Sequence, residues 1–347
     1  MLDRRDFARL ATLAAAATLT TAAPAPSTSA APRRIIKPKR LSPGDTVGLV
    51  LPASATYARD NITFAREQLE ALGLVVVVGE HAYDRHGYFA GTDRDRAADI
   101  NRMFEDDRIH GVICYTGGWG SPRVLPYLDY DLIARKPKVL TGFSDITALL
   151  NAVHQRTGLV TFHAPTGSST FESYTVENFR RVVMTPEPAG LLTPPSKRSD
   201  VLADRVNRIV RLHGGKASGR LAGGNLTLLA ALMGTPYEID TAGAILFAED
   251  VEEAVYRVDR MLTQLALGGK FDAMAGFAFG RCTRCEEQPS QFSLEDVFRD
   301  RFGGTGKPAI TGLSFGHIEQ KLTLPIGIQA TLDADTGTLT IDESAVA

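Results

Sequence analysis

The sequence predicts two α/β domains. The first is a doubly wound parallel sheet with a nucleophile elbow, and the second is a smaller C-terminal α/β domain. From residue 35 to 170, short apolar runs rich in β-branched residues alternate with longer runs of helical spacing. Strands that alternate with helices favour a parallel sheet with right-handed crossovers. A second alternation of this kind runs from 221 to 345.

The first domain, 35–170, is expected to begin with a strand. Its first helix carries Phe64, Leu69 and Leu72 on one side and ends at Gly73, a typical helix stop. The predicted strands are 46–51, 75–78, 112–115 and one beginning at 139, and the predicted helices are 62–72, 94–104 and 145–154. In doubly wound sheets, functional side chains collect at the carboxyl ends of the strands.

Residues 171–220 differ from both domains. Prolines interrupt a polar stretch at 185–188 and again at 193–195. Such punctuation is typical of connections rather than of strands or helices. We therefore expect a linker or crossover here.

The second domain, 221–345, is expected to hold three helices and five strands. Ser293 should cap the last helix, with Asp296 in its first turn. The expected helices are 225–233, 255–267 and 294–302, and the expected strands are 244–248, 275–279, 309–313, 326–332 and 339–341.

The composition is that of a globular protein. The chain has 347 residues, of which 44% are hydrophobic and 22% charged, and its formal net charge is -2. This length suits about two domains. A nucleic-acid-binding protein would need a strong basic excess, which this chain does not have.

The first residues resemble an export signal rather than part of a domain. Arg4 and Arg5 precede an apolar run, 10–21, that is too short to span a membrane. This pattern is typical of a twin-arginine signal, cleaved near 23–25 or 28–30. We therefore exclude residues 1–31 from the fold and expect export by the twin-arginine pathway to the periplasm or the extracellular space. A Sec signal with a chance arginine pair is the alternative.

The three cysteines do not predict a metal site. Cys114 lies in a predicted strand and is expected to be a core residue. Cys282 and Cys285 form an isolated C-x-x-C, without the second pair or the histidine spacing of a zinc site. They could form a disulfide in an oxidising compartment, although two separate thiols are the commoner case.

A glycine-rich stretch, GGWGS at 117–121, follows the predicted strand 112–115. Glycines permit a tight strand-to-helix turn, and Ser121 would then stand at the start of a helix as in a nucleophile elbow. The stretch does not match the G-x-S-x-G motif. The alternative is a glycine-rich turn whose serine only caps a helix.

Five ordered segments resemble the serine LD-carboxypeptidase family, which includes murein tetrapeptide carboxypeptidases and microcin C self-immunity peptidases. Together they are spread over the chain from residue 89 to residue 327. The segments are FAGTDRDRAADI (89–100), GGWGSPRVLPYLDY…KPKVLTGFSDITALL (117–150), GGNLTLLAALMGTPYE (223–238), ILFAEDVEEAVYRVDRMLTQL (245–265) and GLSFGHIEQKLTLPIG (312–327).

The resemblance implies a Ser-Glu-His triad made of Ser121, Glu249 and His317. Its chemistry suits these residues. A serine hydroxyl needs a base to remove its proton, which histidine does near neutral pH. The carboxylate orients the imidazole and stabilises the imidazolium. From the residues alone, Asp250 competes with Glu249, and His163 competes with His317.

Two departures from the family pattern concern substrate and oxyanion binding. The residue before the glycines is often arginine in the family and is Thr116 here. Pro122 follows Ser121 and has no N–H to donate to an oxyanion. Other donors are therefore needed, and the candidates for oxyanion or substrate contacts are Gly91, Gly118 and Trp119.

The resemblance implies a serine peptidase that cleaves an L–D amide bond at the C-terminus of a murein-type peptide, and the predicted signal implies that this peptidase is exported. No cofactor is expected. The expected partners are the peptide substrate and the twin-arginine translocation machinery, with a homodimer as a further option. Two alternatives are an amide hydrolase that detoxifies microcin C-like aminoacyl-nucleotides, and a non-catalytic periplasmic solute-binding protein.

Overall fold

The computed structural model describes residues 34–196, 202–204, 206–285 and 292–347. The predicted export signal, 1–31, lies outside the described residues. Residues 35–347 form one unit by their internal contacts. Within the described ranges, no helix is both long and apolar enough to cross a membrane.

The first sheet has six strands in the order β12-β5-β4-β3-β1-β2. All neighbouring strands are parallel except β12, which is antiparallel to β5. The bounds are β1 Thr46–Val50, β2 Val75–Val78, β3 Ile109–Cys114, β4 Val139–Gly142, β5 Thr161–His163 and β12 Leu324–Ile326. This is the doubly wound sheet expected from the alternation of strands and helices.

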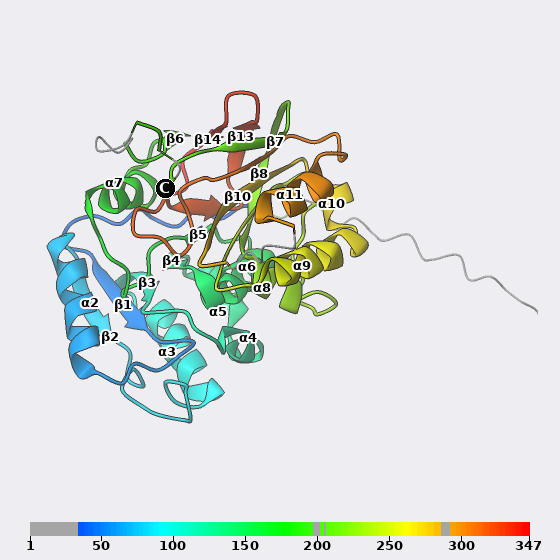
Figure 1. The fold of residues 1–347 in the computed structure, drawn as a ribbon. Coiled ribbons are helices and arrows are strands. Elements are labelled where there is room, and N and C mark those ends of the chain that lie inside the picture. Colours follow the sequence, from blue (N-terminus) through cyan, green and yellow to red (C-terminus); the bar gives the residue numbers. More distant parts are fainter. Residues whose placement is uncertain (1–33, 197–201, 205, 286–291) are drawn as a thin grey trace, which may run out of the picture. The chain divides into compact units, whose positions relative to one another are not determined.

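The order of these strands places the helices on both faces of the first sheet. The chain moves from β1 outward to β2 and then back past β1 to β3. Right-handed crossovers therefore place α2 and α3 on opposite faces, and Figure 1 shows them on the two sides of β1. The helical segments of this half are α2 Arg59–Ala71, α3 Asp93–Glu105, α4 Ser121–Val124, η2 Leu125–Tyr127, α5 Tyr130–Arg135, η3 Ser144–Ile146 and α6 Thr147–Thr157.

The second sheet has eight strands in the order β6-β14-β13-β8-β9-β10-β11-β7. Its centre, from β8 to β11, is parallel, whereas its outer strands are antiparallel. The bounds are β6 Gly190–Leu192, β7 Val210–His213, β8 Lys216–Asn225, β9 Ile245–Val251, β10 Gly276–Thr283, β11 Ala309–Thr311, β13 Gln329–Asp333 and β14 Thr338–Ile341. The mixed sheet confirms a second α/β domain.

The helices of the second half lie along this mixed sheet (Figure 1). They are α7 Ser173–Val183, α8 Leu226–Ala231, α9 Val255–Leu267, α10 Lys270–Ala273 and α11 Leu294–Phe302. Ser293 caps α11 as predicted: its hydroxyl accepts from the Asp296 N–H, and the Asp296 carboxylate accepts from the Ser293 N–H. Satisfying both N–H groups fixes where the helix begins.

The structure differs from the sequence prediction in two connections. The segment expected as a linker, 171–220, contains α7, and it gives β6, β7 and half of β8 to the second sheet. The single strand expected at 326–332 is divided at Gly327, whose φ of +95° turns the chain. Because of this turn, β12 joins the first sheet and β13 joins the second.

Candidate active site

The turn that presents a serine toward a histidine follows β4. That strand ends at Gly142, and Ser144 then adopts a φ of +63°, in the left-handed region that residues with a side chain rarely occupy. Two helical segments, η3 and then α6, follow directly. A serine on a sharp turn between strand and helix is the geometry of a nucleophile elbow. Strained backbone of this kind is typical of functional sites.

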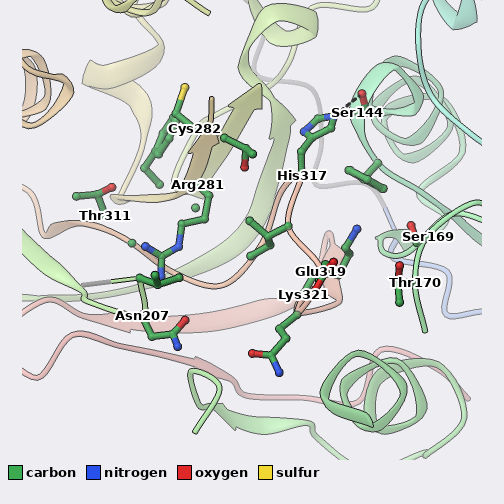
Figure 2. Close-up of a pocket in the computed structure, with 18 of the residues that line it drawn as sticks. Ser144, Ser169, Thr170, Asn207, Arg281, Cys282, Thr311, His317, Glu319 and Lys321 are labelled. Atoms are coloured by element: carbon green, nitrogen blue, oxygen red, sulfur yellow. Dashed lines mark hydrogen bonds between the residues drawn. The ribbon is translucent and has the colours of Figure 1, made fainter. Parts of the chain in front are cut away.

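Ser144, His317 and Glu249 form one hydrogen-bonded chain. His317 Nδ1 lies 2.8 Å from Glu249 Oε2, and it donates because a carboxylate can only accept. Nε2 of the neutral imidazole is then the acceptor for the Ser144 hydroxyl, with 2.9 Å between Nε2 and Oγ. Figure 2 shows His317 directed at Ser144. The arrangement is that of a nucleophile, a base and an acid that orients the base.

Different elements supply these three groups. Ser144 follows β4 of the first sheet, Glu249 lies on β9 of the second sheet, and His317 lies in the connection from β11 to β12. Glu249 has no exposed surface, so the acid that orients the histidine is shielded from water. The serine and the acid that it depends on therefore come from the two halves of the chain.

The structure corrects the prediction for Ser121, which lies outside this chain of hydrogen bonds. Ser121 is fully buried, and its hydroxyl donates to the backbone carbonyl of Asp145. Its N–H also donates to Asp145 Oδ2, at 2.7 Å. Ser121 therefore ties the glycine-rich turn after β3 to the residue that follows Ser144, and it positions the nucleophile elbow.

The glycines at 117–120 serve this close approach of the two turns. A Cβ added at Gly117 would lie 2.8 Å from the Cβ of Ser144 and 3.2 Å from the backbone N of Asp145. Distances this short leave no room for any side chain at Gly117. The glycine pattern thus marks the neighbour of the nucleophile elbow rather than the elbow itself.

A signal for Ser144 does exist in the sequence. Gly142, Phe143 and Ser144 follow an apolar strand and precede a helix, which is the first half of G-x-S-x-G. Ile146 occupies the position of the final glycine in that motif. The prediction above instead assigned the elbow to the glycine-rich stretch 117–121.

The three residues expected near the oxyanion have different positions. Gly118 lines the same cavity as Ser144. Gly91 packs elsewhere, where an added Cβ would lie 3.2 Å from the Cβ of Asp95. The Trp119 N–H already donates to Ser54 Oγ at 3.4 Å. Gly118 is therefore the one of the three that shares a cavity with Ser144 and His317.

The two competing residues, Asp250 and His163, have other surroundings. Both Asp250 carboxylate oxygens are engaged: Oδ1 accepts from Asn225 Nδ2 and Oδ2 from the Thr227 N–H, each at 3.0 Å. Burial, and next the nearby charge of Glu249, raise the pKa of Asp250 to about 6. His163 is buried among aromatic rings, and burial lowers its pKa to about 4. A histidine with this pKa is neutral at pH 7.

A cavity of about 1240 Å³ opens onto the triad. It is lined by Ser144 and His317 at one part and extends past the ends of β10 and β11, at 279–283 and 311–312. Its volume exceeds the usual size of a small-ligand pocket, so a peptide of several residues fits. Its positively charged lining residues, apart from the titratable histidine, are Arg208, Arg281 and Lys321.

The cysteines include one disulfide. Cys282 and Cys285 are bonded to each other, and Cys282 lines the cavity. Cys114 is a buried free thiol whose pKa is raised by burial. Across the described ranges, no three His, Cys, Asp or Glu side chains are grouped so as to hold a metal ion.

Comparisons with known proteins agree with this architecture. The profile of the LD-carboxypeptidase N-terminal domain matches residues 47–164, and that of the LD-carboxypeptidase C-terminal domain matches 218–332. A probable murein peptide carboxypeptidase of Bacillus subtilis is 38% identical over 314 residues, which cover 88% of this chain and 94% of the relative. The murein tetrapeptide carboxypeptidase of Pseudomonas aeruginosa is 33% identical over 295 residues, covering 83% of this chain and 93% of that protein.

A solved structure shares the whole fold. The microcin C7 self-immunity protein MccF, in complex with aspartyl sulfamoyl adenosine, matches with a TM-score of 0.82 and 27% identity. The match covers 90% of this chain and all of MccF. By its profiles, its relatives and its two-domain α/β fold, the chain belongs to the LD-carboxypeptidase family of serine hydrolases.

Proposed function

We propose that the protein is an exported serine peptidase that hydrolyses an L–D amide bond at the C-terminus of murein-type peptides, with Ser144 as the nucleophile. The observation that carries this proposal is the hydrogen-bonded chain from Ser144 through His317 to Glu249. A solute-binding protein has no need of such a chain.

Each group has one role in the proposed reaction. His317 Nε2 removes the Ser144 proton as Oγ attacks the scissile carbonyl, and the same imidazole then protonates the leaving amine. Glu249 keeps the Nδ1–H tautomer and stabilises the imidazolium. Water, activated by His317, finally hydrolyses the acyl-enzyme.

The oxyanion donor in this mechanism is the backbone N–H of Asp145. In serine hydrolases with a nucleophile elbow, the residue after the nucleophile commonly supplies this donor. In this chain that residue is Asp145 rather than Pro122, so the N–H is present. Gly118, which lines the cavity, is the candidate for a second donor.

The substrate class is supported by the relatives, two of which are named for murein peptides. Export is supported by Arg4-Arg5 and the apolar run after them, and it would place the enzyme beside peptidoglycan. Replacing both arginines with lysine should leave the precursor in the cytoplasm. If the precursor with both arginines replaced by lysine still reached the periplasm, the twin-arginine route would be contradicted. The expected homodimer stays a prediction.

A second candidate substrate is an aminoacyl-nucleotide of the microcin C type. The likeness to MccF, solved with aspartyl sulfamoyl adenosine, favours it. Both candidate functions use the same triad. They are distinguished by the rates at which the enzyme cleaves the murein peptide and the aminoacyl-nucleotide.

The proposal is tested with the purified chain lacking residues 1–31. Incubation with a murein tetrapeptide should release D-alanine, which is measured by mass spectrometry. The rate of this release should exceed the rate at which the enzyme cleaves an aminoacyl-nucleotide. Ser144→Ala should lower kcat by at least about 1000-fold. Ser218→Ala is the control, because this exposed serine on β8 bonds only to Thr331 among the described residues. Equal rates for Ser144→Ala and the wild type would refute the assignment.

A further inference from the structure

Lys321 places a buried ammonium group in the cavity that Ser144 and His317 also line. It lies four residues after His317 and lines the same cavity as Ser144. Only 7% of its surface is exposed. Its backbone N–H donates to Thr175 Oγ1 at 3.1 Å, which fixes this part of the connection between β11 and β12.

The charge of Lys321 has no close partner of opposite sign within the described part of the chain. Its Nζ lies 4.4 Å from the centre of the Phe143 ring, a cation–π contact. No described carboxylate lies within 4.0 Å of it, although Glu249 and Glu319 act on it from further away. Burial lowers the pKa of Lys321 to about 8. A buried charge without a partner is costly, so a ligand anion would stabilise it.

The position of this ammonium suits one part of the substrate. A carboxypeptidase must recognise the terminal carboxylate, which lies one residue beyond the scissile carbonyl, roughly 3.5 Å along an extended chain. Phe143 precedes Ser144, and its ring contacts both the Lys321 ammonium and the His317 ring, whose centre is 5.0 Å away. The Phe143 ring thus lies between the Lys321 ammonium and the imidazole of His317, next to Ser144 in the sequence.

The other cations of the cavity are less suited to this role. Arg281 lies on β10, and Figure 2 shows it with Asn207 and Thr311, on the opposite side of the pocket from Ser144. A group there is further from Ser144 than the one amino-acid residue that separates the scissile carbonyl from the terminal carboxylate would allow.

We propose that the Lys321 ammonium binds the terminal carboxylate of the substrate, the carboxylate of the residue that leaves. Lys321 thereby makes the enzyme select free C-termini. This inference rests on the proposed peptidase function and adds to it the group that makes the peptidase a carboxypeptidase.

The test compares a murein tetrapeptide with the same peptide ending in an amide. The wild type should prefer the free acid. Lys321→Met keeps the apolar stem and removes the charge, so kcat/KM for the acid should fall about 10- to 100-fold, mainly through KM, whereas the amide should change little. Lys321→Arg should restore part of the preference.

Lys138→Met is a matched control. Lys138 is also buried, with its pKa lowered to about 8 by burial, but its Nζ donates to the carbonyl of Met103, at 2.8 Å, and to that of Asp106. Lys138 is not among the residues lining the cavity. Its replacement should lower the thermal midpoint and leave the ratio of acid to amide turnover unchanged.

A pH profile adds a second readout. The charged and titratable groups that act on Lys321 are Glu249, Glu319 and His163, and His317 lines the same cavity. Because the ammonium must be charged, kcat/KM for the acid should fall as pH rises through about 8. The amide substrate and Lys321→Met should lack this alkaline limb.

Failure of this inference differs from failure of the proposed function. A folded Lys321→Met with the wild-type ratio of acid to amide turnover would overturn the role of Lys321 while the peptidase stands. If the wild type released no D-alanine, the proposed function would fail. The role of Lys321 would then be tested by measuring how tightly the protein binds the acid and the amide peptides. In a Ser144→Ala background, calorimetry should show tighter binding of the acid than of the amide, and Lys321→Met should abolish the difference. Equal binding of both peptides would overturn it.

Discussion

His163 should make the stability of the protein depend on pH without taking part in the reaction. It ends β5, is 2% exposed, and has the rings of Phe143, Phe247 and Phe315 at centre-to-centre distances of 5.5 to 6.1 Å. Its Nδ1 has no hydrogen-bond partner among the described residues. Protonation would place a charge in this apolar site, where the cost of burial outweighs the attraction of the Glu249 carboxylate.

The magnitude follows from the two pKa values. Burial lowers the pKa of His163 from 6.5 to about 4 in the folded chain. Above pH 6.5 both states are neutral and nothing is lost. Below it the unfolded chain takes up a proton that the folded chain does not, so stability falls as the pH drops toward 4. Between pH 7 and pH 5 the loss from this one group is about 2 kcal/mol.

The assay is urea unfolding at pH 7, 6 and 5, for the wild type and His163→Leu. Subtracting the two curves cancels other groups, such as Asp250, whose raised pKa acts in the opposite direction. The wild type should lose about 2 kcal/mol more than the variant between pH 7 and pH 5. His163→Leu should keep kcat within about 10-fold at pH 7. Equal pH slopes, or a loss of activity like that of Ser144→Ala, would refute the reasoning.

Three further substitutions test the roles of the neighbouring groups. Ser121→Ala removes a donor from the buried Asp145 carbonyl and should cost about 1–3 kcal/mol in urea unfolding. Its kcat should fall less than about 10-fold, because the hydrogen bond from the Ser121 N–H to the Asp145 carboxylate remains. A loss of kcat as large as that of Ser144→Ala would make Ser121 the candidate nucleophile again. Glu249→Gln should lower kcat by about 10³- to 10⁴-fold in steady-state kinetics, since the amide no longer fixes the His317 tautomer or stabilises its charge. A mild effect would show that His317 is oriented by another group. Gly117→Ala should lower kcat by about 100-fold, because the added methyl displaces the nucleophilic serine; unchanged turnover would mean that the two turns can separate freely.

The fold was predictable because its signals are local and repeated. Apolar strands that alternate with amphipathic helices indicated the parallel sheet, and Ser293 marked the start of α11. The division at Gly327 was not predictable in the same way, because the apolar run 324–332 is almost continuous in sequence. Only the tertiary structure shows that its two parts pair with strands of different sheets.

Two of the three residues of the site, Glu249 at the end of a predicted strand and His317 in a loop, were predictable from the sequence. Glu249 and His317 lie within hydrogen-bond distance of each other, as the resemblance implied. Ser144, the proposed nucleophile, was not predicted, because the glycine-rich turn at 117–120 was interpreted as the nucleophile elbow and the serine of the family was assigned to Ser121. Ser144 adopts a positive φ without being glycine. Functional residues often break the local rule that identifies ordinary turns.

The most direct test of the central claim is covalent labelling of the nucleophile. A fluorophosphonate reacts with a serine only when a base activates its hydroxyl, so one labelled peptide identifies the residue. After tryptic digestion, mass spectrometry should find the label on Ser144, and Glu249→Gln or His317→Ala should prevent it. A label on Ser121, or none on Ser144 in an active preparation, would contradict the account.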